Sequence, residues 1–175
     1  NYLSMALAIL LERNQLAAAK LLLTELTADK LREANRDSDF LVQRARFHLL
    51  TGDLSRARAD LMTAHSHSPS PELKSSLVWM LIDTRDSASL NGVLSQWESH
   101  AEQNQELATA IAAGWHALGN TQRALFWSRK LLAGHENDPA WLTNYADLIE
   151  QSGQPDMAWR IRRHVWQETR NKPAT

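Results

Sequence analysis

The sequence predicts an all-α protein, an α-solenoid of about five helix–turn–helix repeats. Three observations predict this fold. Ala, Leu, Gln, Glu and Arg outweigh the β-branched residues, and this balance favours helices over strands. Gly and Pro number only 6 and 5 among 175 residues, so few positions interrupt a helix. Turn-forming residues also recur at a nearly constant spacing, which indicates internal repeats.

Helix-breaking turns recur along the chain. They are Asn14-Gln15, Gly52-Asp53, Gly119-Asn120 and Gly153-Gln154. Gly119 and Gly153 lie about 34 residues apart, and Gly52 precedes Gly119 by about 67 residues, nearly two such periods. A further turn is therefore expected near residue 85, where the stretch 84–87 is polar and unsuited to a helix interior. The first spacing, from Asn14 to Gly52, is one period plus about four residues.

Two small or apolar positions recur at fixed distances from each turn residue. Five residues after it are Ala19, Ala57, Leu90, Ala124 and Ala158. Seven residues before it are Leu7, Ala45, Val78, Ala112 and Ala146. Small side chains at a helix crossing let two backbones approach closely. Each turn is therefore expected to join two closely packed helices.

Larger apolar residues flank these positions at helical spacing. In the first, fourth and fifth units they are Leu3, Leu7 and Leu10; Leu107, Ile111 and Trp115; and Trp141, Leu142, Tyr145 and Ile149. Pro69, Pro71 and Pro139 mark unit boundaries, because proline fits the first turn of a helix. The units are expected to run approximately over 1–34, 37–69, 70–102, 104–137 and 138–171.

This pattern resembles the tetratricopeptide repeat (TPR), whose period is about 34 residues, over nearly the whole chain. The resemblance implies a right-handed α-solenoid and a single repeat domain over residues 1–175. The third unit departs from it by lacking a turn glycine, and a non-repetitive helical bundle is the alternative. The chain opens at Asn1 in what reads as a helix, with neither an initiator Met nor a signal peptide. We therefore expect a fragment of a longer protein.

Several classes of function find no support in the composition. The formal net charge of −1 does not predict a nucleic-acid binder. The absence of cysteine excludes disulfides and thiol catalysis, and it suits an oxidising compartment. No apolar run approaches the roughly 18 residues that span a bilayer. The seven histidines lack a metal-binding or catalytic spacing, and no phosphate-binding loop occurs. We expect no enzyme activity, cofactor or metal.

The first helix of each TPR hairpin lines the concave groove of the solenoid, which gives a set of candidate partner-binding residues. The set is Glu12, Asp39, Arg46, Glu72, Trp79, Asp83, Glu106, His116, Asp147 and Glu150. Seven of the ten are acidic, so the groove is expected to favour a cationic partner. Solvation of an exposed helix face is the alternative interpretation of this charge. Basic residues gather instead in the last helix, at Arg160, Arg162, Arg163, Arg170 and Lys172.

Tryptophan is frequent, with seven residues, and one of them differs from the rest in its place. Trp97, Trp115 and Trp141 occupy core positions, where large packing residues are expected. Trp79 follows the small-residue position of the third unit and is expected to face the groove. An exposed Trp79 there would offer a surface on which a sugar or a peptide stacks.

The last two units carry a more specific resemblance. The segments 118–125 (LGNTQRAL), 138–150 (DPAWLTNYADLIE) and 158–166 (AWRIRRHVW) are similar to the periplasmic TPR region of the PelB family, which exports the Pel exopolysaccharide across the bacterial outer membrane. The stretch from Trp79 to Asp83 and the pair Gln96-Trp97 fit the same family.

That resemblance implies a periplasmic scaffold whose parent protein is anchored in the outer membrane. It would hold a polysaccharide deacetylase or hydrolase near the export pore, and an acidic groove would suit a partly deacetylated, cationic polymer. The alternative is a general TPR adaptor that binds a peptide or protein tail, including one in the cytosol.

Overall fold

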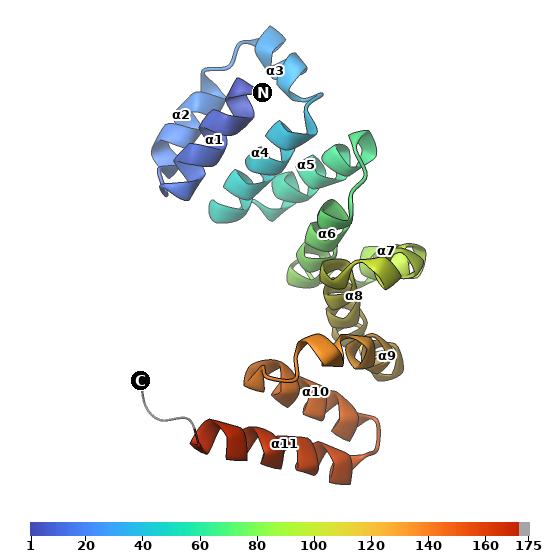
Figure 1. Cartoon of the computed structure of the whole chain (residues 1–175). Helices are drawn as coiled ribbons and strands as arrows, with labels where there is room; N and C mark the ends of the chain where they lie inside the picture. The colour runs from blue at the N-terminus through green and yellow to red at the C-terminus, as the bar shows by residue number, and fades with distance from the viewer. Residues whose placement is uncertain (172–175) are drawn as a thin grey trace. The chain divides into compact units, whose positions relative to one another are not determined.

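The computed structural model describes residues 1–171, and every regular element in that range is a helix (Figure 1). The all-α prediction is confirmed. The chain divides into two compact units, of which the first is Asn1–Arg85 and the second begins at Asp86. No helix in residues 1–171 has the length and apolar character needed to cross a membrane. Lys172, one of the basic residues predicted in the last helix, lies outside the described residues.

The first unit contains six helices. They are α1 (Tyr2–Glu12), α2 (Leu16–Thr24), α3 (Ala28–Ala34), α4 (Ser38–Leu50), α5 (Leu54–His67) and α6 (Pro71–Asp83). α1 packs on α2 and α4, and α5 packs on α4 and α6. The core between α1, α2, α3 and α4 is formed by Leu7, Leu11, Ala19, Ala34, Phe40 and Phe47. The short helix α3 lies where the first turn spacing exceeds the repeat period.

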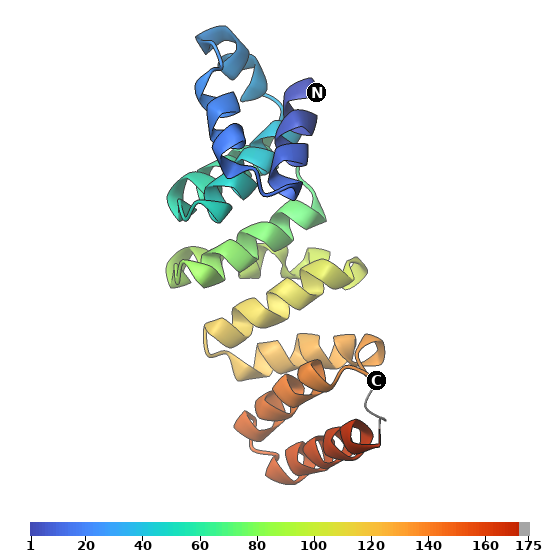
Figure 2. The ribbon, with the colours of Figure 1, turned by 90° about the vertical axis from the view of Figure 1, so that its left-hand side faces the viewer.

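The second unit contains five α-helices and two short 3₁₀ helices within its described residues. They are α7 (Ser87–Trp97), η1 (Glu98–Gln103), α8 (Gln105–Ala117), α9 (Thr121–Leu131), η2 (Leu132–Gly134), α10 (Pro139–Gln151) and α11 (Pro155–Arg170). α8 pairs with α9 and α10 with α11, and α9 also contacts α10 (Figure 2). Leu94, Leu107, Ile111 and Ile149 are fully buried in this unit.

Every predicted turn residue adopts a left-handed backbone conformation. The φ angles are +55° at Asn14, +81° at Gly52, +55° at Arg85, +76° at Gly119 and +87° at Gly153. This conformation ends a helix by turning the chain back on itself. The next residue then begins the following helix. In three turns the side chain of this next residue accepts a hydrogen bond from the backbone amide three residues later, and these residues are Asp53, Asp86 and Asn120.

Four of the predicted hairpins pack within a unit, with α1 on α2, α4 on α5, α8 on α9 and α10 on α11. All ten small or apolar positions that flank the turns are buried, from Leu7 and Ala19 to Ala146 and Ala158. Seven of the ten are alanine, and all seven belong to these four hairpins, where small side chains let two helices approach closely. The repeat pattern in the sequence therefore identified buried positions of these hairpins.

Candidate partner-binding surface

The predicted groove residues of the first unit are exposed on the first helices of its hairpins. Asp39 and Arg46 lie on α4, and Glu72, Trp79 and Asp83 lie on α6. The last three are spaced by seven and four residues, so they share one face of α6. Glu12 is exposed at the end of α1.

Trp79 is held outward by a helix that is otherwise well anchored. Its residue surface is 42% exposed, whereas Leu77, Val78, Met80 and Leu81 are buried on the opposite side of α6. Ser70 caps the start of this helix by accepting a hydrogen bond from the Leu73 amide, at 3.1 Å. An exposed indole on a fixed helix is a rigid contact platform.

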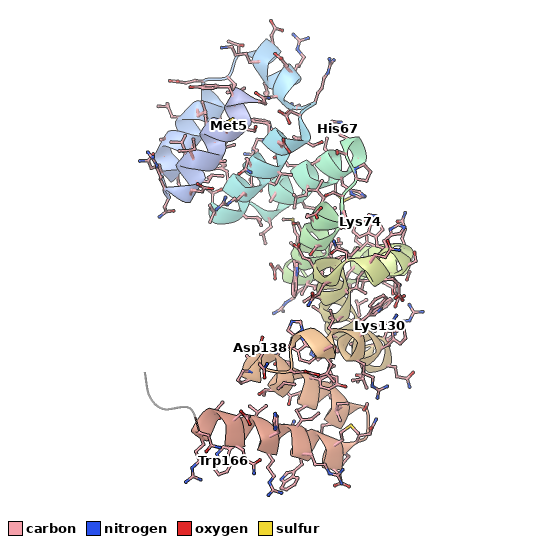
Figure 3. The ribbon with its side chains drawn as sticks, viewed as in Figure 1. Met5, His67, Lys74, Lys130, Asp138 and Trp166 are labelled. Atoms are coloured by element: carbon pink, nitrogen blue, oxygen red, sulfur yellow. The ribbon has the colours of Figure 1, made fainter. Side chains whose placement is uncertain are left out.

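Asp39 lines a shallow groove of about 250 Å³ between α1 and α4. The groove is formed by Ser4, Met5, Ala8, Asp39, Val42 and Gln43, and Met5 is labelled in Figure 3. Asp37 fixes this end of α4, because its carboxylate accepts hydrogen bonds from the amides of Asp39 and Phe40. Burial alone would raise the pKa of Asp37, but hydrogen bonds from Asn1 and these amides lower it.

In the second unit the structure pairs two of the predicted acidic residues with an arginine. Arg162 of α11 donates from Nη2 to Oδ1 of Asp147 at 2.6 Å and to Oε2 of Glu150 at 2.5 Å. These bonds raise the pKa of Arg162. Glu106 and His116 lie exposed on α8. The negative charge expected on α10 is therefore balanced in part by α11.

A second polar cluster lies in the first unit, at a place that no sequence pattern indicated. Arg44 of α4 binds Asp60 of α5 through two hydrogen bonds, of 2.8 Å from Nε and 2.7 Å from Nη2. His48 Nε2 lies 3.8 Å from Oδ2 of Asp60. Burial lowers the pKa of His48, although Asp60 opposes the shift.

This cluster borders an open groove of about 590 Å³. The groove is lined by residues of α2, α3, α4 and α5, and Leu23, Leu31 and Phe47 supply apolar surface. No pattern in the sequence indicated the Arg44–Asp60 pair, because the two residues are 16 positions apart and belong to different helices. The His48 side chain beside this pair is largely buried.

The three tryptophans that were expected in the core differ in burial. Trp97 and Trp115 are buried, as expected. Trp141 was also expected in the core but is only partly buried, and its ring stacks between those of His135 and Tyr145, at centroid distances of 4.7 and 5.2 Å. Within residues 1–171, no cluster of three or more His, Asp or Glu residues could hold a metal ion.

A family model described as the tetratricopeptide repeat matches residues 1–171. The chain belongs to the TPR family. Proteins of this fold are generally non-enzymatic scaffolds that bind other proteins, and helical repeats present extended surfaces suited to that task. No curated protein matches the chain.

Several solved structures share the fold at low sequence identity. MamA from Desulfovibrio magneticus RS-1, from residue 41 to its end, superposes with a TM-score of 0.78 at 13% identity, covering 97% of this chain and 94% of that one. A TPR protein from Parabacteroides merdae ATCC 43184 gives 0.71 at 17% identity, over 98% and 65%. PilF of Pseudomonas aeruginosa gives 0.72 at 11% identity, over 99% and 77%. At these identities the likeness establishes the fold alone.

Proposed function

We propose that this TPR protein is a protein-binding scaffold and that the exposed face of α6 contacts the partner. The observation that carries the proposal is Trp79, a 42% exposed indole between the exposed carboxylates of Glu72 and Asp83. Tryptophan contributes a large contact area at low conformational cost, so it is frequent among residues that dominate binding energy. The carboxylates favour a partner that carries Lys or Arg beside an apolar group.

The same kind of surface occurs on α4. Arg46 is exposed there, and the two leucines that end the helix, Leu49 and Leu50, are 41% and 50% exposed. Apolar side chains beside charged ones are typical of interfaces that form and dissociate. These residues extend the candidate surface of the first unit beyond α6.

Pull-down experiments with matched variants test this surface. The bait is the chain with Trp79→Ala or Asp83→Lys, and the control is Phe126→Ala, which removes an aromatic residue that is 50% exposed on α9. We expect each α6 variant to retain at least roughly tenfold less of the partner than the unaltered chain does, and the control to retain the same amount. Equal retention by all three baits would move the contact to another surface.

A more specific role, in bacterial exopolysaccharide export, is a second candidate. It is supported by the similarity of residues 118–125, 138–150 and 158–166 to the periplasmic TPR region of the PelB family. In this role the chain is periplasmic and holds a polysaccharide deacetylase or hydrolase. The absence of cysteine suits that compartment. A general adaptor that binds a peptide or protein tail accounts equally well for the fold.

The identity of the partner distinguishes these two roles. Periplasmic extract is passed over the chain and over a charge-reversed variant in which Asp83, Glu106, Asp147 and Glu150 are lysine. Recovery of a polysaccharide-modifying enzyme by the unaltered chain supports the export role. Stable capture of a partner from cytosolic extract alone contradicts it.

Direct contact with a cationic polymer is a separate part of the export proposal. Asp147 and Glu150 already bind Arg162, so Glu72 and Asp83 are the carboxylates we expect to matter most. Amine-bearing chitosan oligosaccharides are a suitable probe, and their binding should weaken with added salt. Binding that Glu72→Gln and Asp83→Asn leave unchanged would argue against this contact.

A further inference from the structure

Helix α11 has one face packed and the other open. Ala158 is fully buried, in the hairpin with α10. Trp159 and Trp166 are 58% and 57% exposed, and Figure 3 shows Trp166 projecting from the helix. They are spaced by seven residues, so they share one side of α11. Two large indoles in solvent on one helix face mark an interaction surface.

The equivalent of Trp159 in the preceding hairpin is covered. Leu125 follows Ala124 as Trp159 follows Ala158, and Leu125 is buried. Its helix, α9, packs against α8 and also contacts α10, the first helix of the next hairpin. Arg129, the counterpart of Arg163, is exposed. The position of Trp159 is therefore one that is buried in one hairpin and open in the other.

The chemistry of the α11 face differs from that of α9, because each tryptophan carries an arginine. The guanidinium carbon of Arg163 lies 5.3 Å from the ring centre of Trp159, and that of Arg170 lies 5.0 Å from the ring centre of Trp166. The four residues at 159, 163, 166 and 170 alternate aromatic and cationic side chains along one stripe. A purely apolar helix would leave both arginines without a counter-charge at its contact.

We propose that this stripe is a second docking surface, which takes an amphipathic helix of a partner protein whose apolar side is flanked by Glu or Asp. Leu- or Phe-sized side chains would lie over the indoles, and the carboxylates would meet Arg163 and Arg170. Arg162 is already bound to Asp147 and Glu150, and α11 has three further arginines and two carboxylates, Asp156 and Glu168. This charge complements an acidic partner and disfavours a basic one. The surface is independent of Trp79 and of the face proposed above.

A pair of synthetic helical peptides tests the proposal. Both are about 18 residues long, about five helical turns, with leucines at a spacing of three and four residues. One is flanked by Glu and the other by Lys. Fluorescence anisotropy measures their binding to the whole chain. We expect the Glu peptide to bind, with affinity that falls at higher salt, and the Lys peptide to bind at least tenfold more weakly.

Three variants make the test specific. Two double variants should each weaken binding of the Glu peptide roughly tenfold or more, one with Trp159→Ala and Trp166→Ala and the other with Arg163→Glu and Arg170→Glu. Phe126→Ala is the matched control, because Phe126 is also exposed and has the ammonium of Lys130 4.6 Å from its ring centre, but lies on α9. It should leave binding unchanged. Circular dichroism verifies that each variant keeps its helices, which is expected because all of these side chains are exposed.

Other occupants of the stripe give other results. Equal binding of the Glu and Lys peptides would overturn the acidic character of the partner. Binding to phosphatidylglycerol vesicles without binding to either peptide would assign the stripe to a lipid surface. Self-association of the chain that the tryptophan variant abolishes, with no peptide binding, would assign it to a second copy. Each of these outcomes refutes the proposed partner.

Discussion

At the residue scale, each hairpin depends on one residue with a positive φ angle. Glycine supplies it in three of the five turns and Asn14 in a fourth, and both residue types tolerate this conformation. The third turn uses Arg85, whose Cβ makes the same conformation costly. The missing glycine of the third unit is therefore a departure in residue type and not in backbone geometry.

The same substitution should have opposite effects at two glycines of the second unit. Gly119 has a φ of +76°, and an added Cβ would contact nothing within 4 Å, so Gly119→Ala costs only backbone strain, about 1 kcal/mol. Gly92 lies within α7, also with open space around it, so Gly92→Ala should stabilise by about 1 kcal/mol. Urea denaturation followed by circular dichroism measures both. Effects of the same sign would contradict the assigned turn.

Arg85→Gly should stabilise the chain by about 0.5 kcal/mol, since two effects partly cancel. Glycine removes the strain of a left-handed residue with a side chain, about 1 kcal/mol. Glycine also raises the conformational entropy of the unfolded chain, which offsets part of this gain in stability. Arg85→Ala is the control, because alanine keeps the Cβ and should leave the strain in place. The midpoint of urea denaturation reports the difference between the two variants, and an equal midpoint would show that the turn is unstrained.

His48 should make stability depend on pH. Burial holds its folded pKa below the ordinary value of 6.5, so the unfolded chain takes up a proton at higher pH than the folded chain. Its contribution to stability is full above the unfolded pKa and is lost as the pH falls through the folded pKa. Comparing urea denaturation of the chain and His48→Gln between about pH 7.5 and 5.5 isolates this effect. A larger loss in the variant would contradict it.

Asp60→Asn probes the same cluster from the other side. Asp60 raises the pKa of His48 against the effect of burial, so its removal should lower that pKa further, as an NMR titration of the imidazole would show. It also leaves the largely buried Arg44 without its counter-charge and with one of its two hydrogen-bond acceptors, at a cost of about 3 kcal/mol. A rise in the His48 pKa, or an unchanged stability, would mean that the pair is open to solvent.

At the scale of elements, the sequence predicted helices and turns well and side-chain partners poorly. The repeat spacing located the turn at Arg85 without a glycine, because backbone geometry repeats even where residue type does not. The separate helix α3 was not foreseen, since the first spacing showed only about four extra residues and no break. Arg162 could not be assigned to Asp147 and Glu150, because side chains on different helices, 15 and 12 positions apart, have no periodic signature. The partner-binding residues stay a prediction.

The contact between α7 and α8 offers an element-scale prediction. A Cβ on Gly114 would lie 2.7 Å from Cδ2 of Leu94, which is fully buried. Gly114→Ala should therefore destabilise by about 2 kcal/mol, although alanine favours the helix. Leu94→Ala in the same chain removes the clash, so the double variant should lose less stability than the sum of the losses in the two single variants. Additive losses would show that the two helices do not meet at this point.

At the scale of the whole molecule, two compact units imply that stability is distributed locally. In a repeat protein each element depends chiefly on its neighbours, so the effect of a core cavity should stay within its own unit. Leu7 and Leu94 are both fully buried, one in each unit. Replacing either by alanine should cost about 3 kcal/mol at its own site.

Hydrogen exchange on the full chain measures how far each loss spreads. Leu7→Ala should speed exchange in α1, α2 and α4 and leave α8 to α10 unchanged, whereas Leu94→Ala should do the reverse. Faster exchange throughout the chain in both variants would mean that the units unfold as one block. A local response has a functional consequence, because a partner bound on α6 would then stabilise the first unit, while a helix docked on α11 would stabilise the second. The two proposed surfaces are thus expected to bind their partners with little coupling between them.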